Sequence, residues 1–547
     1  MKKGLSIFLA IIFVLSVALA GCGGGTTDTT TKPSEQASDK PAAEVQKTLV
    51  FGRGGDSVSL DPSQVTDGES LNVTKNIFDT LIDYKDGNTE IQPALAETWE
   101  SSADGLVWTF KLKQGVKFHD GTDFNAEAVV FNFNRWMDPA NEYHQGDFPY
   151  YGYMFGGYKG DEGHVIKEVV AKDEFTVEIQ LNAPQGPFLN NLAMTPFAIA
   201  SPEAVKKHKD KFGEHPVGTG PFVFVEWLPN DKIVLDKNPN YYKTGFPLLE
   251  KIIFKSIPDN SARFTALQSG DIDMMDGVNP DDVTLAEGNE NLQVWLRPSM
   301  NVGYLAFNTE KAPFDNPKVR QALSMAVNKQ GLIDAFYNGL AEPAKNPMPP
   351  SLWGYNDSIT DYEYNLVKAK ELLAEAGFPN GFETDFWYMP VPRPYIPQGK
   401  KIAEAMQADF EKIGVKVNLR TEEWATYLDL TGKGEHSMAL LGWTGDNGDP
   451  DNFIYVLLDK DNAKGPDAGN IAFYKNDALH DILIKAQQSS DEAERTKLYE
   501  DAQEIIHNDA PWVPLVHSTP PLVGKKNIKG FNPHPTGSDK FTEVHFE

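Results

Sequence analysis

A single cysteine, Cys22, stands in this chain of 547 residues, and it limits how the fold can be stabilised. One thiol cannot form an intramolecular disulfide, so the packing of a core must hold the folded state together. A chain of this length can bury an ample core, but it exceeds the size of one ordinary domain. The sequence therefore predicts a large, disulfide-free globular body of two or three domains.

The residues before Cys22 have the pattern of an export signal. Lys2 and Lys3 precede an apolar run from residue 5 to residue 19, and the small residues Ala20 and Gly21 lead directly to the cysteine. This arrangement resembles the lipobox of bacterial lipoproteins. We expect residues 1–21 to be a cleaved signal peptide and Cys22 to be the lipid attachment point. The alternative, an uncleaved membrane anchor, would normally be longer.

Residues 22–46 are rich in Gly, Thr, Ser, Pro and Lys and show no hydrophobic periodicity. Such a segment cannot bury enough apolar surface to fold. We expect a disordered tether that, as a flexible coil, spans on the order of 25–30 Å.

Charge and motif content exclude several classes of function. The chain has 50 Lys+Arg against 78 Asp+Glu, a formal net charge of −28, and so acidic a surface repels nucleic acid. The sequence contains no G-x-S-x-G elbow, H-E-x-x-H motif, P-loop or Cys/His cluster with zinc spacing. We therefore expect a protein that is not an enzyme and that has no cofactor or metal.

Strand and helix patterns alternate along the body. Alternation predicts strands at 48–51, 107–112, 415–419 and 512–517, and apolar residues at helical spacing predict helices at 126–136, 400–413 and 491–507. Asn125 is a helix N-cap, and Asn316 followed by Pro317 is another. Because the helix at 400–413 leads directly into a strand, the fold class is α/β.

Arg393 is the first candidate binding residue. Four prolines surround it between residues 388 and 397, and they should hold the segment extended and restrict the guanidinium. A preorganised guanidinium is suited to bidentate capture of a carboxylate. A solvated arginine in a surface loop is an equally compatible interpretation.

The loop 445–451 is the second candidate. Its acids, Asp446, Asp449 and Asp451, fail the spacing of an EF-hand calcium loop in both possible registers. We interpret the loop as a rigid turn that presents one carboxylate, with Trp443 beside it.

Several motifs together resemble the peptide- and nickel-binding class, family 5, of extracellular solute-binding proteins of ABC importers. They lie at residues 95–121, 218–222, 301–305 and 318–323. Two further segments, 389–395 with its Arg-Pro-Tyr core and 442–452, resemble the dipeptide-binding branch of that class. The resemblance covers much of the chain after the tether.

The resemblance implies a site for a peptide with two charged ends. In that branch, the residue matching Asp446 binds the α-ammonium and the residue matching Arg393 binds the α-carboxylate. The charges of a dipeptide lie roughly 5–7 Å apart, and burying either one unpaired would cost several kcal/mol. The residues implied to line the same cleft are Trp424, Tyr395, Trp443, Gly54 and Gly55.

The resemblance also implies a type II periplasmic-binding-protein fold, in which two lobes close on the ligand like a flytrap. Segments 48–80, 215–300 and 519–547 would form the main lobe, 81–214 an extra subdomain in that first lobe, and 301–518 the second lobe. A monomer, lipid-anchored outside the cytoplasm, would deliver short peptides to a membrane permease and its ATPase.

Other hypotheses remain open at this stage. Within the class, the cargo could instead be an oligopeptide, glutathione, a haem or a metal complex. A peptide sensor could use the same fold, and an exported hydrolase could use two of the many carboxylates.

Overall fold

The computed structural model describes residues 46–466 and 468–547. The predicted signal peptide, Cys22 and nearly all of the tether lie outside this range. Within it, no helix is both long enough and apolar enough to cross a membrane.

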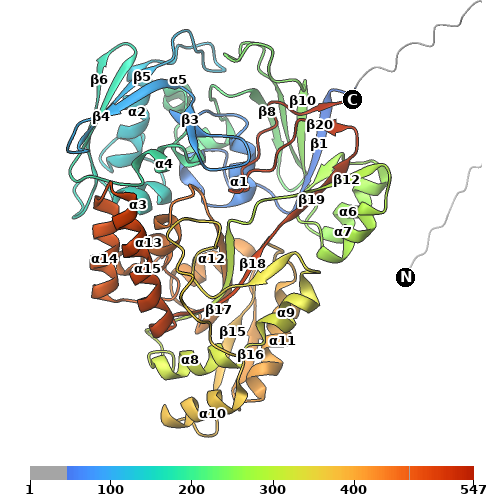
Figure 1. Cartoon of the computed structure of the whole chain (residues 1–547). Helices are drawn as coiled ribbons and strands as arrows, with labels where there is room; N and C mark the ends of the chain where they lie inside the picture. The colour runs from blue at the N-terminus through green and yellow to red at the C-terminus, as the bar shows by residue number, and fades with distance from the viewer. Residues whose placement is uncertain (1–45, 467) are drawn as a thin grey trace, which may run out of the picture. The chain divides into compact units, whose positions relative to one another are not determined.

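A seven-stranded sheet gathers strands from distant parts of the chain (Figure 1). In spatial order the strands are β12 (Leu292–Leu296), β19 (Pro521–Lys525), β11 (Met274–Met275), β1 (Thr48–Arg53), β10 (Lys251–Ser256), β9 (Lys232–Lys237) and β8 (Phe222–Leu228). The first strand of the described residues, β1, is central and pairs in parallel with both β10 and β11. Helices α1 (Gly68–Thr74), α6 (Asn260–Ser269) and α7 (Pro280–Glu287) belong to the same region.

A six-stranded sheet forms the second large layer. Its order is β14 (Ala341–Pro343), β18 (Trp512–Ser518), β13 (Asn301–Phe307), β17 (Met438–Thr444), β15 (Glu383–Trp387) and β16 (Lys416–Arg420). Every residue of β13 is buried, between antiparallel neighbours β17 and β18. Its helices are α8 (Pro317–Ala326), α9 (Lys329–Phe336), α10 (Leu366–Glu375), α11 (Gly399–Glu411), α12 (Trp424–Gly432), α13 (Asp451–Leu458), α14 (Asp477–Gln488) and α15 (Glu492–Asp509).

The chain passes between these two sheets twice, from β12 to β13 and from β18 to β19. Both connections are short, and the second is the red segment that runs from one sheet into the other in Figure 1.

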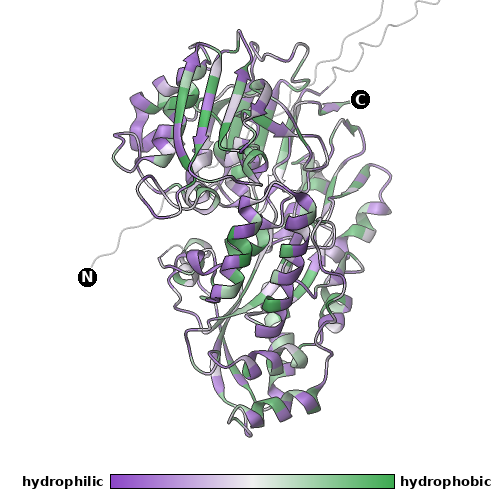
Figure 2. Cartoon of the chain, turned by 60° about the vertical axis from the view of Figure 1, so that its left-hand side comes forward, coloured by the Kyte–Doolittle hydropathy of each residue, from purple (hydrophilic) through white to green (hydrophobic). Residues whose placement is uncertain are grey.

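A four-stranded sheet is built from the early part of the chain, in the order β4 (Ala96–Ser101), β5 (Val107–Leu112), β7 (Thr176–Leu181) and β6 (Ile166–Asp173). Helices α2 (Ala126–Met137), α3 (Pro149–Phe155), α4 (Phe188–Leu192) and α5 (Pro202–His208) accompany it, and two short pairs complete the strands, β2 (Ile82–Tyr84) with β3 (Ile91–Pro93) and β20 (Ile528–Lys529) with β21 (His545–Phe546). Hydrophobic and hydrophilic residues alternate along the strands of the four-stranded sheet in Figure 2. Such alternation is expected when one face of a sheet is buried.

The strands and helix caps predicted from the sequence are confirmed. The predicted strand at 107–112 is β5, and the strands at 48–51, 415–419 and 512–517 are found within a residue or two of their predicted bounds. Asn125 caps α2 by accepting a hydrogen bond from the Ala128 amide, and Asn316 caps α8 with Pro317 in its first turn. The mixed α/β class is therefore correct.

Candidate functional site

A cavity of about 250 Å³ lies between the two large sheets. Its lining comes from Gly54, directly after β1, and from α1 on one side, and from β17, α12 and the loops around residues 393 and 446 on the other. Six of the predicted site residues line it: Gly54, Arg393, Tyr395, Trp424, Trp443 and Asp446. Gly55 does not line the cavity, and its carbonyl accepts a hydrogen bond from Ser256 Oγ.

The segment around Arg393 forms a tight turn, so the expectation of an extended segment is wrong. The Arg393 amide donates to the Ile396 carbonyl at 3.1 Å, and the Ile396 amide donates back to the Arg393 carbonyl at 3.0 Å. Pro394 and Tyr395 occupy the corner. Proline restricts φ to a value that the first corner position of a turn also requires, so it favours this turn as readily as an extended chain.

Distant residues hold this turn in place. Tyr337 Oη donates to the Tyr395 carbonyl at 2.7 Å, and Ser518 Oγ donates to the Pro394 carbonyl at 2.9 Å. The ring of Tyr395 packs directly on the backbone of Gly442, where a Cβ would lie 2.2 Å from the ring. The turn therefore presents Arg393 from a rigid base.

The guanidinium of Arg393 has two close neighbours, Trp424 on its own side of the cavity and Glu69 on the opposite side. It lies over the ring of Trp424, 4.8 Å from the centroid, which is a favourable cation–π distance. One of its terminal nitrogens, Nη1, donates to Glu69 Oε1 at 3.3 Å. Among residues 46–466 and 468–547 this is its one hydrogen bond from the guanidinium, so most of its five donors remain available to a ligand.

The carboxylate of Asp446 is held by a neighbouring side chain. Asp446 follows β17, and its amide donates to Asn452 Oδ1 at 2.8 Å, while Asn452 Nδ2 donates to Asp446 Oδ2 at 3.1 Å. Asn452 Oδ1 also accepts from Trp443 Nε1 at 3.1 Å. One buried amide thus orients both the acid and the adjacent indole.

Asp446 lacks a cation. Burial raises the pKa of its carboxyl from 3.8 to about 7, and hydrogen bonds from Asn452 and Tyr150 offset only part of that rise. No Lys, Arg or His of the described chain forms an ion pair with it. Among the described residues no cation compensates the charge of this buried carboxylate, so it is suited to bind the cation of a ligand.

The other two acids of the loop serve different partners. Asp449 forms an ion pair with Arg495 at 2.8 Å, and Asp451 accepts hydrogen bonds from Gln487 and Tyr499. Of the three, Asp446 alone lines the cavity.

Three arginine–acid pairs around the cavity were missed by sequence reasoning. They are Arg393 with Glu69 at 3.3 Å, Arg263 with Asp276 at 4.0 Å and Arg297 with Asp539 at 2.7 Å. Members of two pairs are 324 and 242 positions apart in the chain, and no local motif marks them. Burial is the main cause that raises the pKa of Glu69 to about 7, and the charge of Asp276 adds to it.

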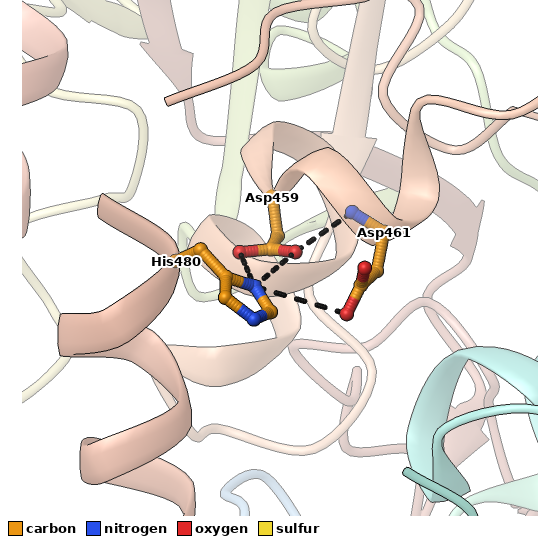
Figure 3. A group of neighbouring side chains, drawn as sticks. All are labelled: Asp459, Asp461 and His480. Carbon is orange, nitrogen blue, oxygen red and sulfur yellow. Dashed lines mark hydrogen bonds and ion pairs between the residues drawn. The ribbon is translucent and has the colours of Figure 1, made fainter. Parts of the chain in front are cut away.

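A separate group of side chains lies outside the cavity, formed by Asp459, Asp461 and His480 (Figure 3). His480 Nδ1 lies 3.1 Å from both carboxylate oxygens of Asp459, a distance at which the ring N–H donates. Asp459 also accepts from the Asp461 amide at 2.8 Å, as the N-cap of a short helical turn. These hydrogen bonds join the end of α13 to α14, so the cluster has a structural role.

Comparison with known proteins agrees with this architecture. A family model described as bacterial extracellular solute-binding proteins, family 5 Middle, matches residues 90–465. Heme-binding protein A of Haemophilus influenzae is 40% identical over 97% of this chain and 97% of its own length, and the dipeptide-binding protein of Escherichia coli strain K12 is 38% identical over 92% and 96%. The structure of the ABC transporter-associated periplasmic binding protein DppA from Helicobacter pylori, in complex with the peptide STSA, superimposes with a TM-score of 0.86 at 41% identity, covering 92% of this chain and 98% of that one.

The chain belongs to family 5 of the bacterial extracellular solute-binding proteins. The predicted family and the predicted two-lobed solute-binding fold are thereby confirmed. The family is one of transporter-associated binding proteins and not one of enzymes.

Proposed function

We propose that this protein captures dipeptides and other short peptides outside the cytoplasm and delivers them to the permease and ATPase of an ABC importer. The observation that carries the proposal is the unpaired Asp446 in the same cavity as the Arg393 guanidinium. A peptide zwitterion supplies the cation that Asp446 lacks and a carboxylate for the donors of Arg393. Trp424 and Tyr395 add apolar surface that excludes water from both charges.

Closure over the ligand would use the two large sheets as separate lobes. We assign 48–80, 215–300 and 519–547 to the main lobe, 81–214 to its extra subdomain and 301–518 to the second lobe. Supporting this division, strands β1, β8 to β12 and β19 share one sheet and β13 to β18 share the other. The two short connections between the sheets would act as the hinge.

Anchoring belongs to the same proposal. A signal peptide at 1–21, a lipid on Cys22 and a tether to residue 46 would keep a monomeric binding protein close to its transporter. The composition of these residues and the position of the single cysteine support it.

Haem is the second candidate cargo, because heme-binding protein A of Haemophilus influenzae shares 40% identity over nearly the whole chain. Among the described residues, the cavity lining contains three tyrosines that could ligate iron, Tyr150, Tyr337 and Tyr395, but no histidine, cysteine or methionine. Each of these hydroxyls or rings is already engaged: Tyr150 with Asp446, Tyr337 with Tyr395, and Tyr395 against Gly442. The two charged side chains of the cavity, Asp446 and Arg393, therefore fit a peptide zwitterion better than they fit haem.

Calorimetry on the purified protein tests the proposal with alanyl-phenylalanine, its N-acetylated form, glutathione and haemin as separate titrants. We expect tight binding of the free dipeptide and a large loss on acetylation. Tight haemin binding together with no response to dipeptides would replace the proposal by the haem alternative.

A further inference from the structure

Glu69 occupies one side of the Arg393 guanidinium. It is the second residue of α1, beside the seven-stranded sheet, whereas Arg393 belongs to the body of the six-stranded sheet. Their ion pair therefore spans the cavity. Both side chains are largely enclosed, with 11% of Glu69 and 16% of Arg393 exposed.

The neighbouring Arg263 cannot replace Arg393 as the hydrogen-bond donor to the Glu69 carboxylate when a ligand binds. Its Nε donates to the Asp276 carbonyl, its Nη1 to Ile257 and Pro258 carbonyls, and its Nη2 to Asn260 Oδ1 and the Gly277 carbonyl. All five of its donors are thus engaged. A new bond to the Glu69 carboxylate would leave one of these buried acceptors without a partner.

The other charged groups that face Glu69 are also engaged. Arg53 of β1 donates to Ser57, to Asp56 and to the backbone carbonyl of Glu69. Asp276 faces Glu69 as a second acid and adds repulsion to its ionised form. No described cation beyond Arg393 donates a hydrogen bond to the carboxylate of Glu69.

A ligand carboxylate on Arg393 would place two negative groups on one guanidinium. Like charges that share a buried site raise the cost of ionising one of them. Because burial already raises the pKa of Glu69 to about 7, protonating this residue near neutral pH costs little. Asp446, the remaining acid of the site, is the residue proposed to bind the ammonium of the ligand.

We propose that Glu69 holds Arg393 in the empty protein and takes up one proton when the carboxylate of the ligand replaces it on the guanidinium. The inference rests on the proposed function, because it requires Arg393 to receive a ligand carboxylate. The proton comes from the solvent and stays on Glu69, whose neutral hydroxyl can then donate to that carboxylate. Glu69 thereby selects for cargo with a free carboxyl end and makes its capture weaker at alkaline pH.

The test is calorimetry at pH 7.5 in phosphate and in Tris, whose different ionisation enthalpies report the protons taken up on binding. The titrants are alanyl-phenylalanine and its C-terminal amide, and the proteins are wild type, Glu69→Gln and Glu422→Gln. The last variant removes the same charge from an exposed position near Trp424 and is the matched control. Comparing the acid with the amide on wild type needs no variant and stands even if Glu69→Gln fails to fold.

With the free acid, wild type and Glu422→Gln should take up about 0.8 proton more than Glu69→Gln, since a group with a pKa of about 7 is mostly ionised at pH 7.5. With the amide, all three proteins should give the same count. Between pH 7.5 and 8.5 the affinity of wild type for the acid should fall about tenfold relative to that of Glu69→Gln.

Two negative outcomes differ. If the acid binds much more tightly than the amide but the proton counts of wild type and Glu69→Gln agree, the role of Glu69 is refuted and the proposed function stands. If acid and amide bind equally, or neither binds, Arg393 does not receive a ligand carboxylate, and the proposed function and the inference both fail.

Discussion

Replacing Asp446 by Asn should weaken peptide binding and stabilise the empty protein. The pKa of Asp446 rises from 3.8 to about 7 on burial, and one pKa unit corresponds to about 1.4 kcal/mol. The ionised carboxylate in the empty cavity therefore carries a cost of up to about 4 kcal/mol. An ammonium removes this cost, so Asp446→Asn should lose about 3–5 kcal/mol of dipeptide binding, at least a hundredfold in affinity.

The effect on stability has the opposite sign and a defined pH window. Since the folded-state pKa lies above the unfolded value, the folded protein retains this proton more tightly than the unfolded chain. The contribution of Asp446 to stability therefore falls as pH rises from about 4 to about 7 and is constant above that. Asp446→Asn should match wild type near pH 4 and exceed it above pH 7.

Calorimetry and urea unfolding at pH 4.5 and 8 measure both effects on the same samples. An N-acetylated dipeptide, which lacks the ammonium, should bind wild type poorly and lose little more from Asp446→Asn. If the losses from acetylation and from the substitution simply add, Asp446 does not contact the peptide amine. A variant that is less stable than wild type at pH 8 would show that the carboxylate is not strained in the empty cavity.

Three further outcomes are expected. Arg393→Met should cost about 3–5 kcal/mol with a free dipeptide and little with its C-terminal amide, measured by calorimetry, and equal losses with both would contradict its assignment. Dipeptides should bind at least about tenfold more tightly than tetrapeptides, since the two anchors define a fixed span, and equal affinity would indicate an oligopeptide binder. Cys22→Ala should release the protein from the membrane fraction and abolish metabolic lipid labelling, whereas unchanged fractionation would refute the lipid anchor.

Much of the local structure was predictable because it depends on residues a few positions apart. Asn125 and Asn316 cap helices through amides two or three residues ahead, and alternation identified β5 with its bounds. Motifs in single segments were also sufficient to predict the family. Among site residues, Arg393 stood out because prolines surround it, Asp446 stood out as part of an acidic cluster, and both line one cavity.

The tertiary structure decided what those residues face. The prolines around Arg393 are compatible with an extended chain or a turn, and hydrogen bonds from Tyr337 and Ser518, both remote in sequence, select the turn. Glu69 is an ordinary acid in a helix until folding places it against a guanidinium 324 positions away and buries both. Long-range pairing and desolvation depend on the whole packed body, so the sequence alone could nominate the two anchors but could not show that one is already paired and the other is not.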